Sequence, residues 1–204
     1  MQYSYILILQ KVIMLYSGAE AHIFESTFFG LPVLVKQRIP KNYRHKTLDL
    51  QIRKARNSRE VKLLSFVKKL GVLCPTVYYV GENYFFMNKI NGKLLRESTE
   101  VDVLTLLGKQ IAMMHASGVF HGDLTTANVL VSNGLPYIID FGLGGFSHDV
   151  EDKSIDLLLM KRSLNFGFDT LINAYIQNYE DLYESKKIVS HISEVEKRAR
   201  YVQR

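Results

Sequence analysis

Residues 121–128 read His-Gly-Asp-Leu-Thr-Thr-Ala-Asn, and residues 139–142 read Ile-Asp-Phe-Gly. Phosphoryl transfer needs a carboxylate facing the nucleophile, oxygen ligands for Mg²⁺ and a cation at the phosphates. Asp123 supplies the first, because a carboxylate can orient or deprotonate an attacking hydroxyl or water. Asn128 and Asp140 supply the hard oxygen donors that Mg²⁺ favours. The two motifs together therefore predict a phosphoryl-transfer site that binds Mg·ATP.

Asp140 follows Asp123 by seventeen positions, a distance that suits a loop, a short hairpin and a return strand. Such an arrangement would bring the two carboxylates to one place. The alternative interpretation is that both motifs are ordinary turns. It requires the two patterns to occur by coincidence in this order and at this spacing.

The expected cation is Lys36, which ends the apolar run LPVLVK at residues 31–36. A lysine at the end of such a strand can reach the phosphates of ATP. We expect Glu60, on the helix that follows, to hold Lys36 in an ion pair, so both are assigned to the catalytic set. The competing readings are a lysine that extends into water and an ordinary exposed helix acid.

Two further segments are candidate ATP contacts. The first is a turn with only one glycine, a poor match to a glycine-rich loop, although backbone amides of a tight turn can still donate to phosphate oxygens; it comprises Ser17, Gly18, Ala19, Glu20 and Ala21. The second is a predicted hinge beside the adenine, with contacts from Met87, Asn88 and Ile90. A plain edge strand is the alternative for this second segment.

Hydrophobic periodicity predicts an α+β protein with a minimal, bilobal protein-kinase-like fold. Residues 17–90 read as an N-lobe, a sheet with one main amphipathic helix over 47–70. Residues 91–185 read as a small helical C-lobe, in which Asp102 is expected to cap the first helix and helical patterns dominate from Ser154 onward. Residues 186–204 read as a basic helical tail. Residues 1–16 read as a first strand, or as an upstream extension with Met14 as the functional start.

The composition indicates which cellular compartment and which classes of partner suit the protein. The 204 residues carry a formal net charge of +6, which weakly favours nucleic acid, nucleotide phosphates or acidic surfaces as partners. A single cysteine, Cys74, excludes an internal disulfide and fits a reducing cytoplasm or nucleus. The apolar stretch 3–16 contains Lys11 and is too short to span a bilayer, so no membrane association is expected.

Several features of a conventional protein kinase are missing. The motif is His-Gly-Asp, so the arginine that would receive an activation-loop phosphate is absent. Only fifteen residues separate Asp140 from Asp156, and they contain no Ala-Pro-Glu sequence. This leaves little room for a platform that binds a peptide substrate. We expect Asp156 to brace the catalytic loop by accepting backbone hydrogen bonds, with a surface helix acid as the alternative.

Six stretches together resemble one family: SGAEA (17–21), PKNYRH (40–45), RNSRE (56–60), HGDLTTAN, IDFGL and VEDKSID (150–156). The chain is similar to the small atypical, RIO-like serine/threonine kinase of the KEOPS/EKC complex, which supports threonylcarbamoyladenosine formation on tRNA. The resemblance covers nearly everything from Ser17 to the tail. Asn88 departs from it, since the family usually has an acid there, and so does Ala127, where serine is common.

The resemblance implies an Mg·ATP-dependent ATPase that also phosphorylates serine or threonine. It makes Asp123 the proton acceptor, Asn128 and Asp140 the metal ligands, and Lys36 and the turn around Gly18 the ATP contacts. It also implies a threonylcarbamoyl-transferring subunit on the C-lobe and a small regulatory subunit on the N-lobe.

The basic tail is a candidate contact for tRNA, although most such charge runs are solvated faces. The alternatives to this family reading are a free-standing protein kinase, a small-molecule kinase of the aminoglycoside type and a catalytically inactive scaffold.

Overall fold

The computed structural model describes residues 10–97 and 100–202. The chain divides into two compact units. The first contains the chain up to Ser65 together with Pro75–Ile90, and the second contains Phe66–Cys74 and the chain from Asn91 onward.

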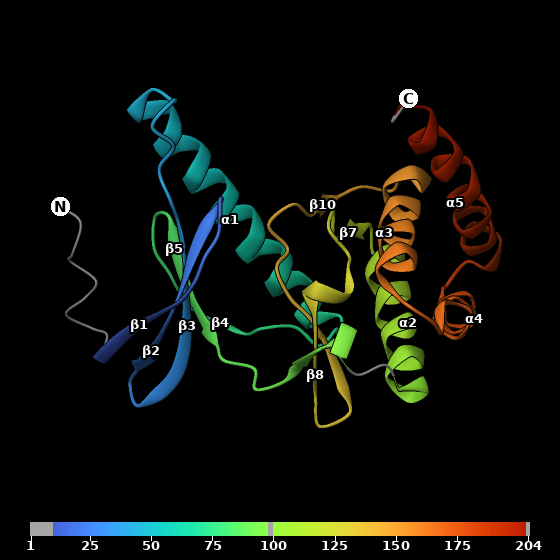
Figure 1. The fold of residues 1–204 in the computed structure, drawn as a ribbon, viewed down its shortest axis with the longest axis horizontal. Helices are drawn as coiled ribbons and strands as arrows, with labels where there is room; N and C mark the ends of the chain where they lie inside the picture. Colours follow the sequence, from blue (N-terminus) through green and yellow to red (C-terminus); the bar gives the residue numbers. More distant parts are fainter. Residues whose placement is uncertain (1–9, 98–99, 203–204) are drawn as a thin grey trace. The chain divides into compact units, whose positions relative to one another are not determined.

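The first unit is a five-stranded antiparallel sheet with most of one long helix, α1 (Lys46–Lys69) (Figure 1). The strand order is β1-β2-β3-β5-β4. The bounds are β1 Gln10–Ser17, β2 Ala21–Phe28, β3 Leu31–Arg38, β4 Val77–Val80 and β5 Tyr84–Asn88. The turn predicted at Phe29-Gly30 joins β2 to β3, and both residues adopt the positive φ angles, 48° and 79°, of a two-residue hairpin turn.

Strand β3 places different chemistry on its two faces, because successive side chains alternate. Val33 and Val35 are fully buried and pack with Phe86 in a small apolar core. Lys36 and Arg38 point to the other face, where both reach Glu60 of α1. The sheet therefore presents its cations to the helix and its aliphatic residues to the opposite side.

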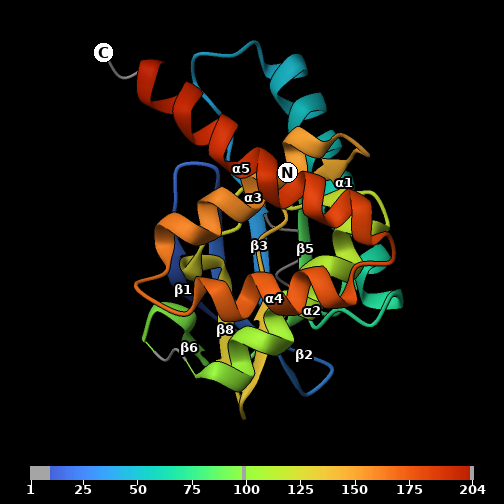
Figure 2. The ribbon, with the colours of Figure 1, turned by 90° about the vertical axis from the view of Figure 1, so that its right-hand side faces the viewer.

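Besides the end of α1, the described part of the second unit contains four α-helices, α2 (Val101–Ala116), α3 (Val150–Ser163), α4 (Phe168–Asn178) and α5 (Leu182–Val202). Helix α2 packs against α4, and α3 packs against α5 (Figure 2). Gly108 permits the first contact, since a Cβ there would lie 2.3 Å from the carbonyl oxygen of Leu171 on α4. The short strands are β6 (Lys93–Leu94), β8 (Val129–Ser132) and β9 (Leu135–Ile138) in one sheet, and β7 (Val119–Phe120) with β10 (Gly145–Phe146).

The compact units are not the continuous ranges expected from the sequence, because residues 66–74 group with the second unit. Two hydrogen bonds explain this. The Leu73 N–H donates to the side-chain oxygen of Gln110 on α2 at 2.6 Å, and the Leu73 carbonyl accepts from the Ile138 N–H at 2.9 Å.

Three expected boundaries also need correction. Helix α2 begins at Val101 after Glu100, so Asp102 lies inside its first turn and is not the cap. Helix α3 begins at Val150, before Ser154. The tail has no separate start at residue 186, because α5 runs unbroken from Leu182.

Strand β1 covers residues 10–16 of the range expected for a first strand and continues one residue further, to Ser17. The part of that prediction covering residues 1–9 falls outside the described residues. Among the helices of the described residues, none combines the length and the apolar character that crossing a bilayer requires.

The Cys74 thiol should be unreactive toward alkylating reagents in the folded protein. Its side chain is fully buried, and burial raises the pKa of the thiol to about 11. At pH 8 only about one thiol in a thousand would be the reactive thiolate. We expect iodoacetamide to label Cys74 at least about 100-fold more slowly in native protein than in urea, as followed by mass spectrometry. Rapid, complete labelling of native protein would contradict this burial.

Candidate active site

The His-Gly-Asp loop and the Asp-Phe-Gly segment are joined by a β-hairpin in the second unit. After the loop, a short 3₁₀ turn (Thr126–Asn128) leads into β8, and β8 pairs with β9. The hairpin turn is Asn133-Gly134, with φ angles of 51° and 74°. The return strand ends beside the loop, because the Ile139 N–H donates to the Asn128 carbonyl at 2.9 Å. The expected loop, hairpin and return strand are thus confirmed.

His121 links the two segments. Its Nε2 lies 2.9 Å from the Ile139 carbonyl, and its Nδ1 accepts from the Asp123 N–H at 3.3 Å. These partners require a neutral imidazole with its proton on Nε2. The ring is fully buried and lies 4.7 Å from the ring of Phe141. His121 therefore supports the backbone on which Asp123 and Asp140 are placed.

Asp123 and Asn128 form a hydrogen-bonded pair. The side-chain nitrogen of Asn128 donates to the Asp123 backbone carbonyl at 2.8 Å and to its carboxylate at 2.9 Å. Because both partners are acceptors, the amide nitrogen must face Asp123. Asn128 consequently offers its Oδ1 oxygen as a ligand, and a neutral amide oxygen is a donor that Mg²⁺ accepts.

Asp140 has an exposed side chain and an unusual backbone, with a φ angle of 60°. A non-glycine residue in this left-handed region costs about 1–3 kcal/mol, and such strain is concentrated at functional sites. One carboxylate oxygen accepts from the Gly142 N–H at 3.1 Å, while the neighbouring Phe141 is fully buried. The donor set of Asp140 and Asn128 fits Mg²⁺, since both supply hard oxygen atoms.

Asp156 of α3 braces the catalytic loop, as expected from the sequence. Its two carboxylate oxygens accept from the backbone N–H groups of His121 at 2.5 Å and Gly122 at 2.8 Å. Gly122 has a φ angle of 81°, and a Cβ on it would lie 2.4 Å from the Leu143 carbonyl oxygen. The carboxylate is fully buried and fixes the backbone immediately before Asp123.

Two residues that the sequence did not single out extend this brace. The Nε2 of His115 lies 3.3 Å from Asp156, and its Nδ1 lies 3.2 Å from the hydroxyl of Tyr175 on α4. Burial, with nearby acidic groups, raises the pKa of Tyr175, so its hydroxyl stays protonated and donates to Nδ1. His115 therefore donates from Nε2 to Asp156. Helix α4 is linked to the catalytic loop by this buried chain.

Asp156→Asn should reduce turnover by about 10- to 100-fold with little change in KM for ATP. The amide keeps the shape but replaces one acceptor oxygen with a donor, which would oppose a backbone N–H and shift the loop. Steady-state kinetics would measure this. Asp152→Asn makes the same change four residues earlier on α3, at a partly exposed site, and should leave turnover unaltered. Equal kinetics for the two variants would contradict the bracing role.

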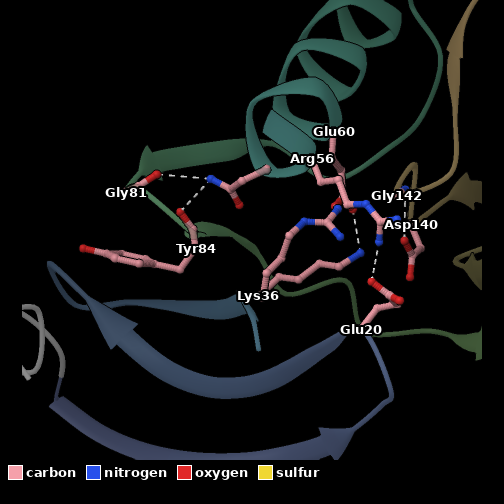
Figure 3. A network of polar contacts seen from close by, with 10 residues as sticks. Glu20, Lys36, Arg56, Glu60, Gly81, Tyr84, Asp140 and Gly142 are labelled. Carbon is pink, nitrogen blue, oxygen red and sulfur yellow. Dashed lines mark hydrogen bonds and ion pairs between the residues drawn. The ribbon is translucent and has the colours of Figure 1, made fainter. Parts of the chain in front are cut away.

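In the first unit, Lys36 and Glu60 form the predicted ion pair. The Lys36 ammonium lies 2.6 Å from one carboxylate oxygen of Glu60, and both side chains are drawn in Figure 3. The other oxygen lies 2.6 Å from the guanidinium of Arg38, a residue that the sequence motifs do not point to. All three side chains are buried. The alternatives of a solvated lysine and an exposed helix acid are therefore wrong.

The five predicted phosphate-contacting residues form the turn between β1 and β2 together with the strand residues on either side, Ser17 at the end of β1 and Ala21 at the start of β2. The Gly18 N–H donates to the Ala21 carbonyl at 3.0 Å, so this amide is used to close the turn itself. The Glu20 carboxylate forms an exposed ion pair with Arg56 at 2.5 Å, drawn in Figure 3. Lys41 donates to the Ala19 carbonyl. Phosphate binding by this turn stays a prediction.

The predicted hinge begins on β5, which lies between β3 and β4. The edge-strand alternative for this segment is therefore wrong. Met87 pairs with Leu34 on one side, and Asn88 exchanges backbone and side-chain hydrogen bonds with Thr76 at 3.0 and 2.6 Å. Ile90 follows the end of the strand. Contact between these residues and adenine stays a prediction.

A cavity of about 570 Å³ opens elsewhere in the second unit, at the start of α3 and beside α5. Its lining is Asp149, Val150, Glu151, Asp152, Ile155 and His191. Three carboxylates would repel a triphosphate, so this cavity does not replace the motif residues as a nucleotide site.

Comparison with known proteins places these residues in a family. A model of the RIO domain matches residues 33–157. A probable serine/threonine-protein kinase BUD32 homolog from Archaeoglobus fulgidus is 35% identical over 189 residues, covering 91% of this chain and 94% of that protein. The RIO-domain match and the BUD32-homolog match both span the motif residues from Lys36 to Asp156.

A probable bifunctional tRNA threonylcarbamoyladenosine biosynthesis protein from Methanobrevibacter smithii is 41% identical over 192 residues. The chain spans only 36% of that relative's length. The Rio2 kinase–ADP/Mg²⁺–phosphoaspartate complex from Chaetomium thermophilum matches 96% of this chain and 70% of its own, with a TM-score of 0.69 and 14% identity. That likeness supports the α+β protein-kinase fold. The chain therefore belongs to the RIO-domain family and, within it, to the BUD32 kinase homologs.

Proposed function

We propose that this protein is an Mg²⁺-dependent ATP phosphotransferase and ATPase that works inside a tRNA-modifying assembly of the KEOPS type. The observation that carries the proposal is the Asp123–Asn128 pair, joined by the β8–β9 hairpin to the strained Asp140. The buried Lys36–Glu60 pair supplies the remaining element that phosphoryl transfer needs.

Each residue has one role in the proposed reaction. Asp123 accepts the proton of the attacking hydroxyl or water as that oxygen bonds to the γ-phosphorus and ADP departs. The Asn128 oxygen and the Asp140 carboxylate would hold Mg²⁺, which neutralises charge on the phosphates. Lys36, kept in place by Glu60, binds phosphate oxygens, and the segments 17–21 and 87–90 contact the rest of the nucleotide.

The short region after Asp140 favours ATP hydrolysis that is coupled to an assembly. Fifteen residues separate Asp140 from Asp156, and their only regular strand is the two-residue β10. Such a segment offers little surface to a peptide substrate. In this assembly, a threonylcarbamoyl-transferring subunit would bind the second unit and a small regulatory subunit would bind the first. The assembly would work in the cytoplasm or nucleus. Relatives named as probable bifunctional tRNA threonylcarbamoyladenosine biosynthesis proteins, of whose length this chain spans about a third, support this partnership.

The test is to purify the chain with the proteins that co-precipitate with it, to identify them, and to assay ATP hydrolysis with and without Mg²⁺ and tRNA. We expect hydrolysis that requires Mg²⁺ and rises when the partners and tRNA are present. Peptide phosphorylation that is equally fast without any partner would instead show a free-standing protein kinase. No turnover with the partners present would show an inactive scaffold.

A further inference from the structure

The positive charge of the chain is concentrated in residues 41–62, which we call the basic segment. It contains eight lysine and arginine residues and two acidic residues, a net charge of +6 that equals the formal net charge of the whole chain. The segment begins in the loop after β3 and continues through the first two-thirds of α1. The rest of the protein is therefore electrically balanced.

Both acids of the basic segment are removed from its surface. Asp49 is 3% exposed and pairs with Arg53 at 2.7 Å and Arg44 at 3.7 Å. Glu60 is 1% exposed and is directed to Lys36 of the sheet. Two acids outside the segment pair with its cations, Glu20 with Arg56 and Glu82 with Lys54. The segment's own acids do not face outward, whereas cations such as Lys46 and Arg59 do, and an excess of exposed positive charge attracts a polyanion.

The cations along α1 follow a regular spacing. Arg53, Arg56, Arg59 and Lys62 occur every third residue, and residues three apart on a helix are neighbours. Arg59 and Lys62 are exposed, as is Lys46 at the first residue of the helix. Lys46 and Arg59 lie about 20 Å apart along the axis, so a ligand that touches both must be extended.

The loop before α1 adds an aromatic side chain to this surface. Tyr43 is 78% exposed, and the Arg44 guanidinium lies 5.1 Å from the centre of its ring. In both Figure 1 and Figure 2 this loop and the first turns of α1 extend past the ends of the strands of the same unit. An exposed tyrosine beside arginine is suited to stack on an unpaired base.

The C-terminal helix is a weaker candidate for the same ligand. The described side chains of α5 include Lys186, Lys187, Lys197 and Arg198, but also the acids Glu184, Glu194 and Glu196. Arg198 pairs with Glu151 at 3.2 Å, and Glu196 accepts from Lys161 at 3.3 Å. Positive charge on this helix is thus interleaved with negative charge and partly neutralised.

We propose that the basic segment is the surface on which a structured RNA binds, with its phosphates along α1 and an unpaired base on Tyr43. The identity of that RNA as a tRNA rests on the proposed function, whereas the position of the surface rests on the charges alone. An acidic protein is the rival occupant.

The experiment measures binding of a fluorescently labelled tRNA transcript to the full chain over a range of salt concentrations. Lys46→Gln with Arg59→Gln should weaken binding about tenfold and make the slope of log K against log salt shallower by about 1.5, since each phosphate contact contributes about 0.7–0.9. Tyr43→Ala should weaken binding about 5- to 100-fold without changing that slope. Lys186→Gln with Lys187→Gln removes the same charge from α5 and should change neither quantity.

An α5 variant that weakens binding as much as the α1 variant would overturn the proposal, and so would full binding by the α1 variant. Competition by polyglutamate as effective as that of RNA would assign the surface to an acidic protein instead. ATP hydrolysis without RNA is assayed on the same samples and should be equal in wild type and both double variants. Failure of the proposed function would appear as absent hydrolysis in the wild type, a result that is independent of the binding measurement.

Discussion

Asp123→Asn is expected to slow Mg·ATP turnover by about 10²- to 10⁴-fold, the range that a general base contributes. The amide cannot accept the nucleophile's proton, but it has nearly the same shape. Its oxygen can still accept from Asn128, whose nitrogen lies 2.9 Å from the present carboxylate. The loop should therefore keep its conformation, and the loss should appear in kcat with ATP affinity retained. Single-turnover kinetics and ATP titration would measure the two effects separately.

The matched control for this variant is Asp152→Asn, which removes the same charge from a partly exposed position of the same unit. It should have wild-type kinetics and an unchanged thermal unfolding midpoint. If Asp123→Asn retained turnover within about threefold of wild type, Asp123 would not be the proton acceptor, and the assignment of the site would be wrong.

Glu60→Ala is expected to lower the free energy of unfolding by about 3–5 kcal/mol, the usual result of removing one partner from a buried ion pair. Glu60 holds two cations, Lys36 and Arg38, whose side chains are 7% and 4% exposed. Without that carboxylate, buried positive charges lie close together with less compensation. Urea unfolding followed by circular dichroism would measure the change.

Glu82→Ala provides the comparison, because Glu82 also pairs with a lysine, Lys54, at 2.7 Å. The Glu82 side chain is 68% exposed, so its loss should cost no more than about 1 kcal/mol. Two variants with equal unfolding free energies would show that the Lys36–Glu60–Arg38 cluster does not stabilise the first unit.

The sequence predicted the part of this cluster that rests on a recurring pattern and missed the part that depends on strand geometry. Lys36 ends an apolar run and Glu60 lies on the next helix, so their pairing followed from order alone. Arg38 lies on the same face of β3 two residues later. Whether such a residue turns toward a helix or toward water depends on how α1 crosses the sheet, and one sequence does not specify that crossing.

The residues that support the catalytic loop also divide into one that the sequence predicted and two that it did not. Asp156 was predicted because an acid shortly after the Asp-Phe-Gly segment can reach the loop. His115 and Tyr175 were not, since they are sixty residues apart and meet only where α2 packs on α4. That packing depends on the close approach at Gly108, which periodicity does not reveal.

Gly122 limits how this protein can be controlled. A side chain of any size at this position would collide with the Leu143 carbonyl while the backbone holds a φ angle of 81°. Installing an arginine there would disrupt the loop instead of adding a sensor for phosphate. A switch in which an arginine at this position binds a phosphate on the protein's own loop is therefore sterically excluded.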